Sequence, residues 1–97
     1  MKMVKADRIT QEKIDKYKNL TEKALEIVKK SIIKGKNKEA KEIINMVQNY
    51  LSDSKYFENK GDLVNAFAAI NYAHGWLDSG ARLGIFLVSD DKLFTVK

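Results

Sequence analysis

The chain lacks several residue types that many functional sites need. Its 97 residues contain no cysteine and no proline, and they contain a single histidine, His74. Without cysteine there is no disulfide, no thiolate nucleophile and no cysteine metal site, and one histidine excludes a multi-histidine metal site within one chain. Without proline, no helix has to be interrupted by a missing amide donor. We therefore expect long helices, and we expect no metal or other cofactor.

Long apolar runs are also absent. No run approaches the roughly 18–20 apolar residues that a membrane-spanning helix needs. Residues 1–8 contain no apolar stretch of the kind found in a signal peptide. We therefore expect a cytoplasmic protein with no membrane partner.

The charge of the chain is positive and uneven. The formal net charge is +5, and residues 1–38 hold twelve Lys and Arg against five Asp and Glu. A basic surface of this kind is either a solvated face or a contact for the phosphates of a polyanion, and nucleic-acid binding is our second functional hypothesis. The stretch 29–38 contains no arginine and no aromatic residue that would stack on bases, which weakens this hypothesis. The lysines proposed as contacts are Lys29, Lys30, Lys34, Lys36 and Lys38.

Apolar residues recur every three or four positions in three segments, which is the pattern of amphipathic helices. The pattern predicts helices at about residues 10–34, 38–59 and 63–88, followed by a tail at 89–97. Helices joined by such short links are antiparallel neighbours. We therefore predict an all-α, up-down-up bundle of three helices, a single domain of residues 1–97, with the tail packing back onto it.

Particular residues suit the ends of these helices. Thr10, Asn37 and Asp62 are residue types favoured at the N-cap, where a side-chain oxygen accepts a hydrogen bond from a free backbone amide. Gly35 and Gly61 suit the ends of the first two helices, because glycine readily adopts the left-handed conformation that closes a helix.

The third predicted helix has apolar residues over well over half of its circumference. A helix on the outside of a bundle needs only a stripe of about 100°. Tyr72, Trp76, Leu83 and Phe86 lie on the side away from its main apolar line, so something must cover them. Another protein chain is one candidate, most simply a second copy, and a protein interaction module that uses this face is our first functional hypothesis. The tail is the other candidate, through Leu93, Phe94 and Val96.

The same helix is rich in small residues. Gly75, Gly80 and Gly84 each cost about 0.5–1 kcal/mol in a helix interior relative to alanine. Small residues let a neighbouring helix approach closely, which recovers such a cost through packing. We therefore place this helix at the centre of the bundle. The small residues that share one line along it are Ala66, Ala69, Ala73, Gly80 and Gly84.

A polar edge runs along the third helix at steps of three and four residues, formed by Asn71, His74, Asp78 and Arg82. A carboxylate one turn from an imidazole can orient it, and Asp78 can pair with Arg82. One interpretation is a small polar site with His74 as acid or base. The other is a structural histidine whose hydrogen bonds are met by its neighbours. Nothing in this stretch supplies a second acid–base group, a nucleophile or a phosphate-binding loop, so we rank an enzymatic or small-molecule site third and favour a non-enzymatic role.

The third predicted helix also carries a distinctive motif. It consists of the run from Lys60 to Asp78, followed by Gly80, Arg82, Leu83, Gly84 and Phe86. Over residues 53–86 this motif resembles an archaeal family of small proteins catalogued as domain-of-unknown-function family 357. The resemblance implies an archaeal source and a left-handed three-helix bundle similar to the spectrin-repeat arrangement. It implies no activity.

Overall fold

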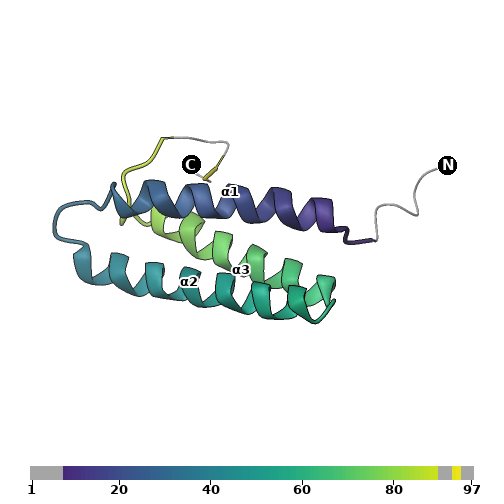
Figure 1. Cartoon of the computed structure of the whole chain (residues 1–97). Coiled ribbons are helices and arrows are strands. Elements are labelled where there is room, and N and C mark those ends of the chain that lie inside the picture. Colours follow the sequence, from purple (N-terminus) through teal and green to yellow (C-terminus); the bar gives the residue numbers. More distant parts are fainter. Residues whose placement is uncertain (1–7, 90–92, 95–97) are drawn as a thin grey trace.

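The computed structural model describes residues 8–89, 93 and 94. Three helices account for most of them: α1 (Gln11–Lys29), α2 (Asn37–Asn59) and α3 (Leu63–Arg82). They run antiparallel to one another in chain order (Figure 1), so the predicted all-α, up-down-up three-helix bundle is confirmed. Helix α3 holds the bundle together, because it packs against both α1 and α2 more extensively than these two pack against each other.

Two of the three helix starts follow from the residue that precedes them. The Thr10 hydroxyl accepts a hydrogen bond from the Lys13 amide at 3.1 Å, and the Asp62 carboxylate accepts one from the Asn65 amide at 3.1 Å. Each bond satisfies an amide that the first turn of a helix leaves free. Both predicted N-caps are therefore confirmed. Helix α2 differs, because Asn37 is its first residue and not its N-cap.

Helix α2 ends where the sequence predicts. Gly61 has a φ of 78°, its amide donates to the Glu58 carbonyl at 3.0 Å, and the Asp62 amide donates to the Phe57 carbonyl at 2.9 Å. These two hydrogen bonds around a left-handed glycine form the Schellman motif. The prediction that Gly61 closes this helix is confirmed.

Helix α3 is shorter than predicted. It ends at Arg82 and does not continue to Val88. The reason is a second Schellman motif, in which Gly84 has a φ of 77° and the Ile85 amide donates to the Gly80 carbonyl at 2.9 Å. The prediction that Gly84 lies inside the helix is therefore wrong.

Helix α1 also ends early, at Lys29 and not near residue 34. The Ser31 hydroxyl donates to the Ile27 carbonyl at 2.8 Å and so satisfies one of the last carbonyls of the helix. Gly35, predicted as the stop, instead lies in the following loop with a φ of 89°.

The residues beyond α1 and α3 pair with each other. Ile32 forms an isolated antiparallel bridge with Phe86. The β-branched pair of isoleucines at 32 and 33 suits this extended conformation better than a helix end. The backbone hydrogen bonds that flank the bridge join the Ile33 amide to the Ile85 carbonyl (3.0 Å) and the Leu87 amide to the Ser31 carbonyl (2.8 Å).

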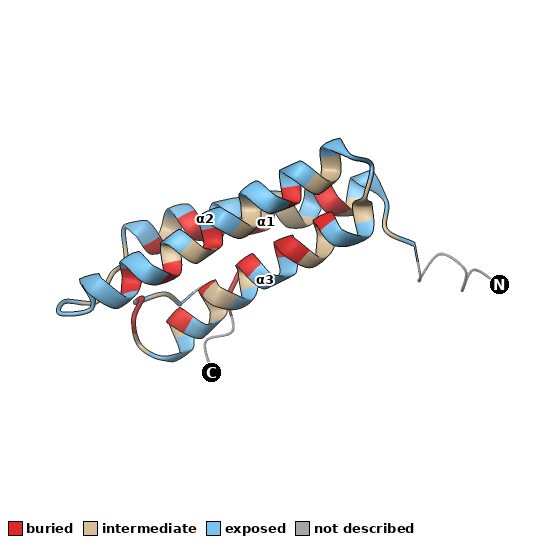
Figure 2. Cartoon of the chain, turned by 90° about the horizontal axis from the view of Figure 1, so that it is seen from below, coloured by how far each residue is buried: buried red, intermediate tan, exposed pale blue. Residues whose placement is uncertain are grey.

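The core lies along one side of α3, where buried residues face α1 and α2 (Figure 2). Leu93 and Phe94 of the tail join this core, which confirms that the tail packs back onto the bundle. Val96, the third residue expected to do so, lies outside the described residues. The buried positions of α3 are Ala66, Ala69, Ile70, Ala73, Leu77 and Gly80.

Gly80 marks a very close contact within the core. A Cβ atom at this position would lie 2.4 Å from Cε2 of Phe86 and 3.1 Å from Cδ1 of Ile43. The chain therefore needs a residue without a side chain here, so that the Phe86 ring can pack over the last turn of α3.

Candidate functional site

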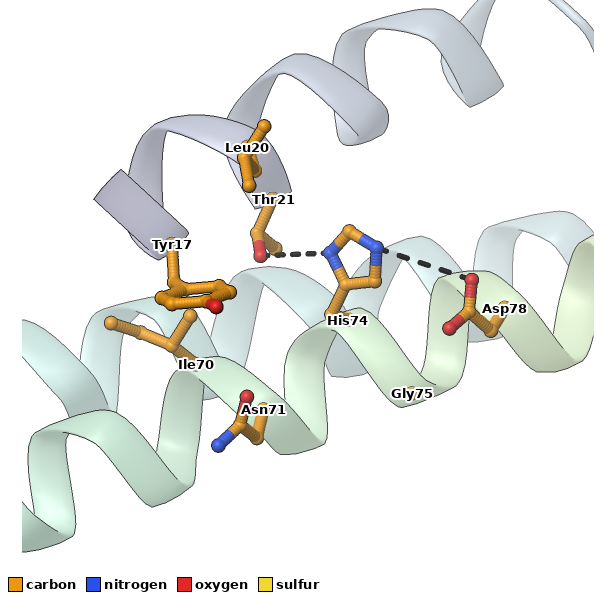
Figure 3. A pocket seen from close by; sticks show the side chains of 8 residues that line it. All are labelled: Tyr17, Leu20, Thr21, Ile70, Asn71, His74, Gly75 and Asp78. Atoms are coloured by element: carbon orange, nitrogen blue, oxygen red, sulfur yellow. Dashed lines mark hydrogen bonds and ion pairs between the residues drawn. The ribbon is translucent and has the colours of Figure 1, made fainter. Parts of the chain in front are cut away.

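His74 lies at the junction of α1, α3 and the C-terminal tail. Its Nδ1 is 3.0 Å from the hydroxyl of Thr21 on α1 (Figure 3), and its Nε2 is 2.5 Å from the carbonyl oxygen of Leu93. A carbonyl oxygen can only accept, so Nε2 carries the hydrogen and the buried Thr21 hydroxyl donates to Nδ1. Both ring nitrogens therefore have hydrogen-bond partners within the chain, which is the arrangement of a structural histidine.

Of the other residues of the predicted polar edge, only Asp78 lies close to His74 among the described residues. Oδ1 of Asp78 is 4.0 Å from Nε2 of His74, at the outer limit of an ion pair (Figure 3). Asn71 and Arg82 are exposed. Within residues 8–89, 93 and 94, Arg82 has no carboxylate within 4.0 Å. The structure thus brings His74 and Asp78 together and leaves Arg82 apart.

A cleft of about 280 Å³ opens beside His74, between α1 and α3 (Figure 3). This volume is at the lower end of the range for small-molecule sites. Since Thr21 and His74 are already bonded to each other, the cleft has few polar groups left for a ligand. In the described part of the chain, no group of three or more His, Asp or Glu residues is placed to hold a metal ion. The lining residues are Tyr17, Leu20, Thr21, Ile70, Asn71, His74, Gly75 and Asp78.

A second surface of interest is the exposed side of α3, which we call the outer face. It is almost free of charge, although a third of the chain is charged. Tyr72 is 62% exposed and Leu83 is 73% exposed, and the Tyr72 ring stacks on that of Tyr50 with centroids 5.5 Å apart. Neither α3 nor any other described helix is long and apolar enough to cross a bilayer. The outer face consists of Val64, Ala68, Asn71, Tyr72, Gly75, Ser79, Arg82 and Leu83.

The structure separates the four residues predicted to form an interaction face. Tyr72 and Leu83 lie on the outer face, and Trp76 lies at its edge, half-buried against the core. Phe86 is only 2% exposed. Its inclusion in the face was wrong, because the helix ends before it and the chain turns back so that its ring packs over Gly80.

Gly75 is the residue of the outer face that sequence reasoning could not interpret. It is exposed in the middle of α3, and no atom of the described residues lies within 4 Å of the Cβ position that it lacks. A glycine there costs about 0.5–1 kcal/mol relative to alanine, and no described contact within the chain requires it. The sequence revealed this cost but not the difference between Gly75 and Gly80. Sequence reasoning also missed Val64, Ala68 and Ser79, because single small or apolar residues carry no motif.

The predicted polyanion contacts lie at the end of the bundle where α1 leads into α2. All five of these lysines are exposed. One of them, Lys29, is 3.3 Å from Glu26, a surface pair that contributes little to stability. The structure therefore shows an accessible basic loop without a feature that selects a ligand.

Glu58 links the start of α1 to the end of α2, away from the outer face. Its carboxylate accepts hydrogen bonds from Lys18, at 3.0 Å, and from Gln11. These two hydrogen bonds, that of Lys18 first, hold the pKa of the Glu58 carboxyl below its ordinary value. The arrangement joins two helices and has no cleft beside it among those described above, so we assign it to stability.

Comparison with known families gives one match. The model of a family described as "Protein of unknown function (DUF357)" matches residues 16–86. The chain belongs to this family. The resemblance seen in the sequence of α3 is thereby confirmed, and the match extends it over most of α1. All residues of the outer face fall within the matched stretch. No curated protein and no solved structure matches the chain.

Proposed function

We propose that this protein is a non-enzymatic, cytoplasmic interaction module that binds another protein through the outer face of α3. The observation that carries the proposal is Gly75, a glycine in the middle of an exposed helix face with open space in front of it. Two helices approach most closely where a side chain is missing. The missing side chain of Gly80 lets the Phe86 ring pack closely against α3 in the core. The missing side chain of Gly75 would let a partner pack equally closely against the exposed side of the same helix.

The shape of the outer face supports a helical partner. One cleft, of about 310 Å³, lies on the Gly75 side of Tyr72, and another, of about 160 Å³, lies between α2 and α3 on the Asp53 side of Tyr72. The two clefts follow α3 along its length, so a rod-shaped partner would fill both.

The chemistry of the outer face supports binding as well. Tyr72 is an aromatic side chain held in place by its stack on Tyr50, so it loses little conformational freedom when a partner covers it. Exposed aromatic anchors of this kind contribute most of the energy in many interfaces. The scarcity of charge means that few ions lose their hydration on binding.

The other two hypotheses have weaker support. The lysines of residues 29–38 are solvated side chains without an aromatic platform beside them in the sequence. His74 has both ring nitrogens hydrogen-bonded within the chain, which leaves neither nitrogen free to act on a ligand in its cleft.

Site-specific photo-cross-linking tests the proposal. A photoreactive amino acid replaces Tyr72 in one version of the protein and Lys23, an exposed residue of α1, in a control version. In cells that make the protein, we expect a protein adduct of defined mass from position 72 and none from position 23. Adding Gly75→Trp to the first version should abolish the adduct, because the indole fills the approach. Equal labelling from both positions, or no adduct from position 72, would contradict the proposal.

A further inference from the structure

We infer that the occupant of the outer face is a second copy of this chain, bound antiparallel about a two-fold axis that passes between Gly75 and Trp76. This inference rests on the proposed function, because it names the partner for the same face. Three properties of the face support it: the order of its large and small residues, the position of its charges, and its length.

Two large residues of the outer face lie opposite two small ones when the face is paired with itself. An axis between Gly75 and Trp76 places Leu83 of one copy opposite Ala68 of the other, and Tyr72 opposite Ser79. Leu83 and Tyr72, two of the large and exposed side chains of the face, then each meet a small one, and the symmetry makes each contact twice. The axis pairs Gly75 of one copy with Trp76 of the other, and Gly75 adds no side chain of its own between the two backbones.

The charges at the border of the face are complementary under the same axis. Arg82 ends α3, and the axis places it opposite Ala68 and Ala69 of the second copy. Asp53 of α2 lines one cleft together with these two alanines. Neither Arg82 nor Asp53 has an ion-pair partner among the residues that the structure describes. A second copy supplies both partners, as two reciprocal Arg82–Asp53 pairs.

The length of α3 sets the expected strength of the dimer. A helix of 20 residues is about 30 Å long, and a contact of that length on one face lies at the lower end of interface sizes. We therefore expect a dissociation constant in the micromolar range, on the order of 10–100 µM. The net charge of +5 on each copy opposes association, so the measurement is made at about 0.15 M salt, which screens charges more than about 8 Å apart.

Charge reversal provides the test, read by sedimentation equilibrium from about 10 µM to about 1 mM protein. Arg82→Glu alone and Asp53→Lys alone each place like charges at both reciprocal contacts. We expect each variant to dimerise on the order of tenfold to a hundredfold more weakly than the native chain. An equimolar mixture of the two variants forms a mixed dimer in which both contacts join opposite charges. We expect this mixture to dimerise as tightly as the native chain.

Controls separate this result from general effects of charge and folding. Lys23→Glu reverses an exposed charge on α1, and we expect it to dimerise like the native chain. Circular dichroism establishes that each variant is folded. If a carboxylate at the end of α3 unfolds the helix, Arg82→Ala replaces Arg82→Glu. Arg82→Ala removes both pairs and should dimerise more weakly than the native chain, and its mixture with Asp53→Lys restores one pair and should dimerise more tightly than Asp53→Lys alone.

The results distinguish this inference from the proposed function. A native chain that stays monomeric at about 1 mM, or a mixture that associates no better than either variant alone, overturns the inference. If the monomeric chain still forms an adduct with a different protein from position 72, the proposed function survives without the second copy. If neither a dimer nor an adduct forms, both are overturned.

Discussion

Gly75 and Gly80 lie little more than one turn apart on α3, yet their surroundings are opposite. The space above Gly80 is filled by the Phe86 ring, so the packing of the chain explains this glycine. The space above Gly75 is open, so none of the described packing explains it. The difference indicates that α3 has one side made for folding and another that is available to a partner. The predictions that follow test each side, from the largest expected effect to the smallest.

Gly80→Ala tests the inner side. The added methyl group would overlap the Phe86 ring, and overpacking of this kind typically costs about 1–3 kcal/mol. We expect the loss to exceed the gain in helix propensity, which is about 1 kcal/mol. Urea denaturation of the variant and the native chain measures the difference. An unchanged free energy of unfolding would mean that Phe86 moves aside easily, and the comparison of the two glycines would fail.

Thr21→Val tests the hydrogen bonds of His74, which join α1, α3 and the tail. The substitution keeps the shape of the side chain but removes the hydroxyl that donates to Nδ1. A buried acceptor left without a donor costs about 1–3 kcal/mol, and we expect roughly 1–2 kcal/mol at this partly exposed ring. Nitrogen NMR should show the hydrogen on Nε2 in the native chain. Thr21→Ser keeps the hydroxyl and should preserve that tautomer; a hydrogen on Nδ1 in the native chain would refute the arrangement.

Lowering the pH tests the contact between α1 and α2 that is formed by the Glu58 carboxylate. The outer face contains no carboxylate. The pKa of Glu58 is lowered in the folded chain, so its ionised form stabilises the fold above the ordinary carboxyl pKa, near pH 4. This stability is lost as the pH falls through the lowered pKa of the folded state. The side chain is 18% exposed, so we expect Glu58→Gln to cost only about 0.5–1 kcal/mol at neutral pH.

The pH dependence identifies the cause. At an acid pH below the lowered pKa of the folded state, where the carboxyl is protonated in both states, Glu58→Gln should be as stable as the native chain. Glu22→Gln, an exposed position on α1, should change the free energy of unfolding little at either pH. A cost for Glu58→Gln that is equal at both pH values would show that packing, and not charge, holds the two helices together here.

Gly75→Ala has the smallest expected effect on folding and the opposite sign. Alanine meets nothing in the open space, so the free energy of unfolding should rise by about 0.5–1 kcal/mol through helix propensity. At the same time the methyl group should weaken association on the outer face. Sedimentation equilibrium and urea denaturation on one sample measure both effects. A chain that gains stability and still associates normally would remove the argument from Gly75.

Much of the bundle follows from local features of the sequence. The three- and four-residue period predicts the helices, and the short links between them predict their antiparallel order. Helices α1 and α3 begin after Thr10 and Asp62 as predicted, and Gly61 closes α2 as predicted. These features act within about one turn, because caps and left-handed glycines satisfy nearby amides and carbonyls. Periodicity also predicts that the third helix has more apolar surface than a bundle of three helices needs, and this stays a prediction.

Other features depend on where distant segments meet. Residues 31–33 and 85–87 fit a helical pattern locally, but each is extended because the other lies beside it. The sequence favours a structural role for the single histidine over catalysis, but it does not identify the partners, Thr21 and Leu93, that bond it in the fold. The two glycines of α3 are likewise the same residue in the sequence. Only the return of Phe86 over Gly80, and the absence of any described contact above Gly75, separates them, because a glycine's role depends on what occupies the space beside it.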